Sequence, residues 1–377
     1  MTAAELILQK ALVGSNLDSR QWNGVQAAIR NRAFFSSQVA EVNILAALRE
    51  RAAEFAERGV DSSEFRKMLR RDLEALRYAP KPGEENTIKD LFSKARLDAI
   101  LQTNEAQARG WIEHAQGMSA GAFAAFPAKE FMRVEQREKP RDNWPQRWRA
   151  AGGRVFDGRM VAMKDDPVWQ NLGDAGPFGN PYPPFDWGSG MGVMDIDRDE
   201  AVELGLVDAD ELRGKVEKIR QTPIPDFNEG LQATVPMEDG SPEAARLKDI
   251  FGDQVRFDGN VMHWRGELIN DVIDGKVGKA KLGRGYDGRN LSISHTIFEE
   301  HLHKHFGEEE HDRRNMPLER GDFELLPAMW RKPDNVTKER NRDHLEFGTF
   351  DGGILNLIVD TVKGIVGFWK AKNPGGA

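Results

Sequence analysis

The chain has 377 residues, enough for two or three domains rather than one ordinary core. It contains no cysteine, which excludes disulfides, thiolate metal sites and cysteine nucleophiles. Its formal charge of −8 argues against broad nonspecific binding of nucleic acid, and the lack of any run of about 18 apolar residues predicts no membrane span.

Residues 1–85 are predicted to form a helical N-terminal arm. Apolar side chains recur at three- and four-residue steps through residues 3–12, and from Val39 to Phe55 in a long helix that ends near Gly59. The stretch 61–64 has the pattern of a capping box, with Asp61 as N-cap, and predicts a further helix. No catalytic constellation occurs here, which favours a packing or docking module.

Residues 86–215 are predicted to form a mixed α/β module. The spacing predicts a helix from Ile88 to Gly110, a strand from Arg159 to Lys164 and a short helix from Asp197 to Leu206. The Gly- and Pro-rich run 174–197 cannot be helical, and its aromatic residues favour an ordered loop or edge strand.

Residues 216–255 contain turn-forming and extended pieces with little apolar periodicity, which favours a linker over a long surface loop. Residues 256–377 are predicted to form a small domain of helices followed by an antiparallel β-meander. The expected strands are 344–350, 354–359 and 365–369, separated by Asp-Gly and Lys-Gly turns. The fold class expected for the whole chain is therefore multidomain α+β.

Five of the eight histidines lie between Ser292 and His311. His301 and His305 are one helical turn apart, with Lys304 between them, and histidine exchanges protons near neutral pH. Three interpretations remain open: an acid–base site, a metal site and a solvated charged helix. A zinc site would use His301 and His305 with His295 or His311, but Leu302 stands where a zinc protease needs its glutamate.

The central module resembles the Mu F-like phage head morphogenesis family over about residues 30–215. The matching pieces, in order, are Arg32–Ser36, Arg96, Ile100, Thr103-Asn104, Ala106–Ala108, Gly110, Met160–Lys164, Pro183–Met191, Asp199–Ala201 and Leu204–Leu206. Many members carry an Asn-Cys-Arg-Cys run after the two prolines, and this chain has Trp-Gly-Ser-Gly-Met instead. The resemblance implies a minor head protein that contacts portal and capsid proteins and is packaged inside the capsid of the virion. It would be present in the host cytoplasm during assembly and again after injection.

The last 122 or so residues resemble the nuclease domains of the barnase, EndoU, colicin E5/D and RelE group, which such head proteins often carry. The matching pieces are His301, Lys304 and His305, then Leu325–Pro327, Lys332–Asp334 and the terminal hairpins. This likeness implies a metal-independent ribonuclease without a cofactor, acting on tRNA or another host RNA to leave a 2′,3′-cyclic phosphate.

The implied roles follow from the chemistry of RNA cleavage, which needs a base, an acid and a cation on the phosphate. His301 and His305 would serve as base and acid. Lys304, with Arg331 or Lys332, would bind the phosphate, and Thr349 would contact it. The alternative is a purely structural head protein whose tail binds portal, scaffold or packaged DNA, and another toxin class such as an ADP-ribosyltransferase is a third interpretation.

Overall fold

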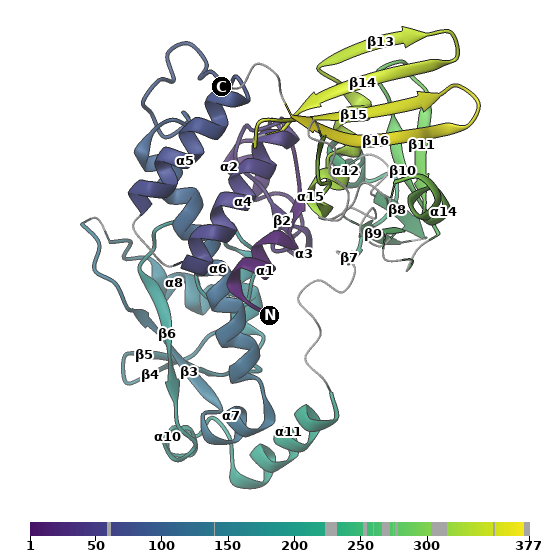
Figure 1. Ribbon diagram of the computed structural model, residues 1–377. Coiled ribbons are helices and arrows are strands. Elements are labelled where there is room, and N and C mark those ends of the chain that lie inside the picture. Colours follow the sequence, from purple (N-terminus) through teal and green to yellow (C-terminus); the bar gives the residue numbers. More distant parts are fainter. Residues whose placement is uncertain are drawn as a thin grey trace.

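The computed structural model describes residues 1–377 apart from 59–61, 139, 223–231, 252–254, 259, 266–271, 274, 276–277, 303–314, 350 and 373–377. It confirms the predicted α+β class: helices dominate the first third, and antiparallel sheets form the middle and the end (Figure 1). No helix within these described residues is long and apolar enough to span a bilayer.

The N-terminal arm is helical, as predicted. Thr2 and Glu5 form a capping box at its first helix, and a short parallel strand pair joins two of its loops. The elements are α1 (Ala3–Leu8), β1 (Ala11–Leu12), α2 (Ser19–Trp22), α3 (Ala27–Arg30), β2 (Ala33–Phe34), α4 (Val42–Arg58) and α5 (Ser62–Ala75). Asp61, the predicted cap of α5, lies outside the described residues.

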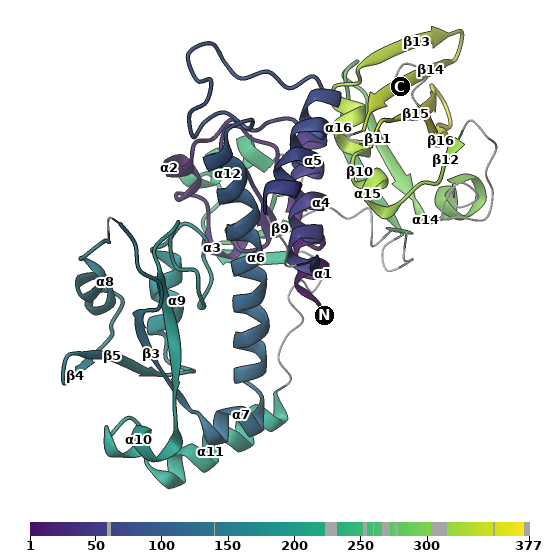
Figure 2. The same cartoon turned by 60° about the vertical axis from the view of Figure 1, so that its left-hand side comes forward.

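The long helix α6 (Lys94–Gly117) runs from the arm down to the central sheet (Figure 2). It starts six residues later than the sequence predicts. The Asp90 carboxylate accepts hydrogen bonds from the backbone N–H of Asn86 and Phe92, and such local bonds compete with helix formation. Ser93 then caps the helix by accepting from the Arg96 N–H.

The central module is an antiparallel sheet with short helices on its flanks. The strand order is β4-β5-β3-β6, so β6, the end of the Gly- and Pro-rich run, is an edge strand. This agrees with the prediction of an ordered loop or edge strand. The elements are α7 (Ala120–Ala125), β3 (Ala128–Arg133), α8 (Trp144–Ala150), β4 (Val155–Phe156), β5 (Arg159–Met163), α9 (Val168–Asp174), β6 (Met191–Ile196), α10 (Arg198–Glu203) and α11 (Ala209–Gln221).

The segment 216–255, predicted to be a linker, contains ordered structure. After α11 come β7 (Gln232–Pro236), α12 (Pro242–Phe251), β8 (Val255–Asp258) and β9 (Val261–Arg265), and the strand order is β7-β9-β8. Ala244 and Leu247 of α12 share a buried core with Trp22 and Ile29 of the arm. The segment is therefore held by contacts with residues more than 200 positions away, which local periodicity does not reveal.

The C-terminal part ends in a five-stranded antiparallel sheet of order β12-β16-β15-β14-β13. Its last three strands confirm the predicted meander. The elements are β10 (Lys279–Arg284), β11 (Asn290–Ser294), α14 (His295–Ile297), the π-helix η3 (Phe298–Leu302), β12 (Asn315–Met316), α15 (Arg320–Glu324), α16 (Leu326–Arg331), β13 (Asn335–Glu339), β14 (Arg342–Gly348), β15 (Gly353–Asp360) and β16 (Gly364–Lys372).

This C-terminal part shares one hydrophobic core with α1, α4, α5 and α6. At the boundary the Arg49 guanidinium lies 2.5 Å from the Glu324 carboxylate, and both side chains are almost fully buried. Arg49 also donates to the Lys10 carbonyl at 3.0 Å. The arm and the C-terminal part are thus joined by apolar packing and a buried ion pair.

Candidate functional site

The C-terminal sheet has two different faces. Side chains alternate between the faces of a strand, so Leu345, Leu357 and Phe368, which are neighbours in the register, point the same way. That face is covered, because Phe368 packs against Phe323 of α15, which in turn packs against Phe298 of η3.

The opposite face, which we call the open face, carries His344, Glu346, Asn356, Ile358 and Trp369. The register places Ile358 beside His344, and Asn356 between Glu346 and Trp369. Within the described residues, none of the hydrophobic cores includes Ile354, Ile358 or Trp369. These three side chains are only partly buried. The open face therefore carries polar, aromatic and aliphatic side chains and has no covering layer in the described part of the chain.

His344 is held in one orientation on the open face. The Asn356 amide nitrogen donates to the Ile354 carbonyl at 2.8 Å, which turns the Asn356 oxygen toward His344 Nε2 at 2.9 Å. An amide oxygen only accepts, so Nε2 carries the hydrogen and the neutral ring keeps Nδ1 as an acceptor. No described residue contributes a partner to Nδ1. His344 therefore presents a proton-accepting nitrogen in a fixed tautomer.

Glu346 is the second titratable group on this face. It lies two residues along the same strand from His344, which corresponds to about 6.6 Å between their backbone positions. Its carboxylate accepts a hydrogen bond of 2.9 Å from the Asn335 amide of the neighbouring strand. A carboxylate and an imidazole at this separation can stand on either side of one phosphate group.

Exposed positive charge surrounds the sheet. Among the described residues from 331 to 372, seven cationic side chains are exposed, against three exposed carboxylates. The cations are Arg331, Lys332, Lys338, Arg340, Arg342, Lys363 and Lys372, and the carboxylates are Asp334, Glu339 and Asp351. The sheet can thus attract a polyanion although the whole chain is acidic.

The predicted phosphate ligands Arg331 and Lys332 lie at one end of this sheet. Both are exposed at the end of α16, where Arg331 Nε donates to the Pro327 carbonyl. The next turn is tied to the sheet, because the Asp334 carboxylate accepts from the Gly348 N–H at 2.8 Å. The structure therefore brings these two cations beside the end of β14, the strand that carries His344.

Thr349, also predicted as a phosphate contact, is buried on the covered side. Its hydroxyl donates to Asp351, and Asp351 and Asp322 both pair with the Lys370 ammonium. Burial alone would lower the pKa of Lys370, but the charges of Asp322 and Asp351 raise it above its ordinary value. Burial likewise raises the pKa of Asp322 despite Lys370. The polar groups of Thr349, Asp351, Asp322 and Lys370 therefore pair with one another.

The predicted histidine helix is described in part. His301 lies in η3, which packs on the covered side of the sheet through Leu302, and the structure describes only its backbone. Lys304 and His305, with His303 and His311, lie outside the described residues, so their roles stay predictions. His295 Nδ1 lies 2.8 Å from the Val272 carbonyl. Within the described residues, no three His, Asp or Glu side chains gather to hold a metal ion.

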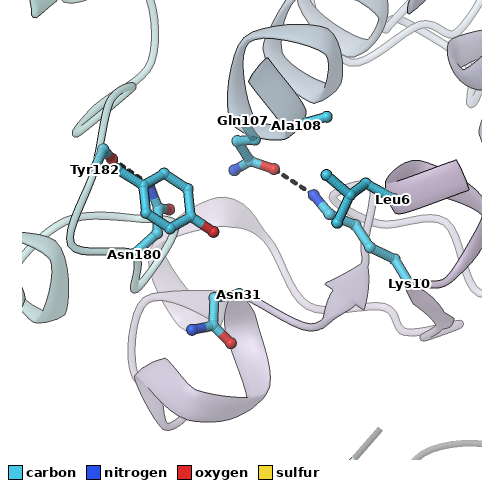
Figure 3. A pocket seen from close by; sticks show the side chains of 7 residues that line it. All are labelled: Leu6, Lys10, Asn31, Gln107, Ala108, Asn180 and Tyr182. Atoms are coloured by element: carbon cyan, nitrogen blue, oxygen red, sulfur yellow. Dashed lines mark hydrogen bonds between the residues drawn. The ribbon is translucent and has the colours of Figure 1, made fainter. Parts of the chain in front are cut away.

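A second titratable constellation lies where α1 meets α6 and the loop before β6. Lys10 is almost completely buried and donates to the Gln107 side chain at 2.5 Å, beside Asn31 and the phenol of Tyr182 (Figure 3). Burial lowers the pKa of Lys10 to about 7 and raises that of Tyr182. The cavity of about 10 Å³ holds no more than a water molecule, so it is not a substrate site.

A larger groove of about 380 Å³ separates the loop 37–41 from the loop 77–91. Its lining includes the exposed cations Arg77 and Lys81 together with Glu41 and Glu84, and contains no histidine. The groove has the character of a mixed-charge surface rather than an acid–base site.

The open face was not found from the sequence. The stretch from Ser292 to His311 contains five histidines, which predicts a site there, whereas His344 is a single histidine in a strand. Its partner Asn356 is set by strand register. The available signal was alternation: His344 and Glu346 occupy the polar positions of a strand whose intervening residues, Leu345 and Phe347, are buried.

Comparisons with family models, with curated proteins and with solved structures find no match to this chain.

Proposed function

We propose that the chain is a phage or prophage minor head protein whose C-terminal part is a metal-independent ribonuclease that works on the open face. The observation that carries the enzymatic half is His344, held in one tautomer by Asn356 and followed by Glu346 on the same strand face. The head-protein half rests on the family resemblance of residues 30–215.

The chemistry requires two proton transfers. One group takes the proton of the 2′-hydroxyl as its oxygen attacks the adjacent phosphorus, and another gives a proton to the departing 5′-oxygen. Glu346 would take the 2′-hydroxyl proton, and His344, when protonated at Nδ1, would give that proton to the departing 5′-oxygen. The bond from phosphorus to the 5′-oxygen breaks as the bond to the 2′-oxygen forms, so the cyclic phosphate keeps the charge of the original diester. Arg342 of the same strand and Lys332 at its far end would stabilise the phosphate in the transition state.

The rival nuclease site is the predicted one, with His301, Lys304 and His305. Of these three residues the structure describes only the backbone of His301, in η3, which packs on the covered side of the sheet through Leu302. A rival function is that of a purely structural head protein. In that case the exposed groove at Arg77 and Lys81 would be the contact surface for portal or capsid proteins.

The full-length chain incubated with single-stranded RNA in EDTA separates these possibilities. Loss of an acid–base residue typically costs about 10²–10⁴-fold, so we expect His344→Ala and Glu346→Gln to lower kcat/KM by at least about 100-fold. Thr337→Ala is the matched control, because Thr337 is exposed directly opposite His344 on β13. It is expected to stay within about threefold of the unmodified chain, on the scale of a surface substitution.

Each outcome has a distinct meaning. Cleavage that survives His344→Ala and disappears in the double variant His301→Ala, His305→Ala would move the site to the histidine helix. Absence of cleavage of every RNA, with no toxicity on expression in bacteria, would leave the structural head protein. Detection of the chain inside purified DNA-filled capsids, protected from added protease, tests the head-protein half separately.

A further inference from the structure

Trp369 lies on the open face, opposite Asn356 in the register. A Cβ built on Gly367 would lie 3.5 Å from Cζ3 of the Trp369 ring and 3.8 Å from the Ile358 Cβ. One edge of the indole therefore lies next to Gly367, in ordinary van der Waals range of that position. Since Trp369 is only partly buried and belongs to none of the hydrophobic cores of the described residues, the outer side of the ring is available to a ligand.

The ring is adjacent to the proposed acid–base group. The centroids of Trp369 and His344 are 5.6 Å apart, and the ring planes are inclined by 32°. A base stacked on the indole would thus stand beside the imidazole, with its own phosphate within reach of His344. The fixed amide of Asn356, opposite Trp369 in the register, prevents the imidazole from turning away.

The surrounding charge favours a nucleic acid over an apolar partner. The seven exposed cations of residues 331–372 lie at both ends of the strands, so a chain of phosphates crossing the face would meet positive charge on entering and leaving. Aromatic platforms flanked by cations are the usual means of binding single-stranded nucleic acid, because every base has a face to stack and a backbone to neutralise.

From these observations we infer that Trp369 is a stacking platform for an unpaired base, which restricts the substrate to single-stranded RNA. The inference rests on the proposed ribonuclease function and specifies its substrate class. In a duplex both faces of each base are covered by neighbouring bases, so the indole has nothing to stack on.

Binding can be measured apart from cleavage. The probe is a fluorescently labelled RNA 10-mer with 2′-O-methyl ribose throughout, which cannot be cleaved because it has no free 2′-hydroxyl. Its affinity for the full-length chain is measured by anisotropy, alone and annealed to its complement. Loss of one base–aromatic stack weakens binding about 5- to 150-fold, which is the effect expected for Trp369→Ala. Trp369→Phe keeps an aromatic face and is expected to remain within about fivefold, near the lower end of that range.

Trp187→Ala is the matched control, since Trp187 is 38% exposed but lies in the central module. It should bind the probe as the unmodified chain does. Equal affinity for the single strand and the duplex, or unchanged affinity in Trp369→Ala, would overturn the inference. A loss of affinity in Trp369→Ala that Trp369→Phe fails to restore would also overturn it, because the loss would then reflect the sheet and not stacking.

The two proposals fail differently. Weak binding by Trp369→Ala together with no cleavage of unmodified RNA supports the platform and removes the ribonuclease. Cleavage of unmodified RNA by Trp369→Ala at the normal rate removes the platform and leaves the ribonuclease.

Discussion

Replacing Lys10 by methionine should stabilise the protein, and by an amount that depends on pH. Lys10 is almost completely buried, and its ammonium has one described partner, the neutral Gln107. Burial lowers the pKa of Lys10 from its ordinary 10.5 to about 7, which corresponds to roughly 5 kcal/mol of stability. Between pH 7 and 10.5 the Lys10 amine is mostly protonated in the unfolded chain and mostly neutral in the folded chain. The free energy of unfolding therefore rises with pH in that range because of Lys10.

The stability difference between the Lys10→Met variant and the unmodified chain should therefore be largest near pH 7. It should shrink by about 1.4 kcal/mol for each pH unit as pH rises toward 10. Urea unfolding followed by circular dichroism at pH 7, 8, 9 and 10 measures this difference. Lys67→Met is the control, since Lys67 is exposed on α5 and a surface substitution is expected to change the free energy of unfolding by about 0.5 kcal/mol or less.

A difference for Lys10→Met that is constant with pH would refute the reasoning, because the buried ammonium would then not be the origin. A variant less stable than the unmodified chain at pH 7 would refute it too. That result would mean that the Gln107 hydrogen bond outweighs the desolvation of the charge.

Two further predictions concern contacts between parts of the chain. Arg49→Met removes the cation that pairs with the buried Glu324 carboxylate and should lower the free energy of unfolding by about 3–5 kcal/mol. The double variant Arg49→Met, Glu324→Met should recover most of that free energy. Equal losses of stability in the single and double variants would contradict this expectation. Gly110→Ala places a Cβ 1.9 Å from the Pro183 carbonyl oxygen and should lower the melting temperature by several degrees. Gly121→Ala, at a helical position with nothing within 4 Å, should leave stability equal or slightly higher.

The terminal strands could be predicted from the sequence because their pattern is local. Alternating burial from Arg342 to Gly348 and the Asp-Gly turn at 351–352 both belong to single short stretches. Strand β13 was not predicted, because Asn335–Glu339 has one apolar residue, Val336, and is held by its register with β14.

The parts that escaped prediction depend on distant partners. Helix α12 and strands β8 and β9 form because Trp22 and Ile29 complete their core. The open face exists because β14, β15 and β16 pair in one register, and a shift by one residue would turn His344 to the covered side. The number of histidines between Ser292 and His311 favours a site at His301 and His305. The strand register instead places the candidate site at His344, a single histidine in its strand.

The shared core also decides how function has to be tested. The C-terminal part buries Phe323 and Phe368 in the same cluster as Leu45 of α4 and Phe65 of α5, with the Arg49–Glu324 pair at the boundary. A fragment that begins at residue 256 would expose that apolar surface and leave the Glu324 carboxylate without its cation. An inactive fragment would then reflect lost packing rather than absent chemistry, because a buried ion pair and its surrounding core cannot be removed without cost. Since the open face lies on the side of the sheet away from this boundary core, the full-length chain keeps it available to RNA, and assays on the full chain test the chemistry itself.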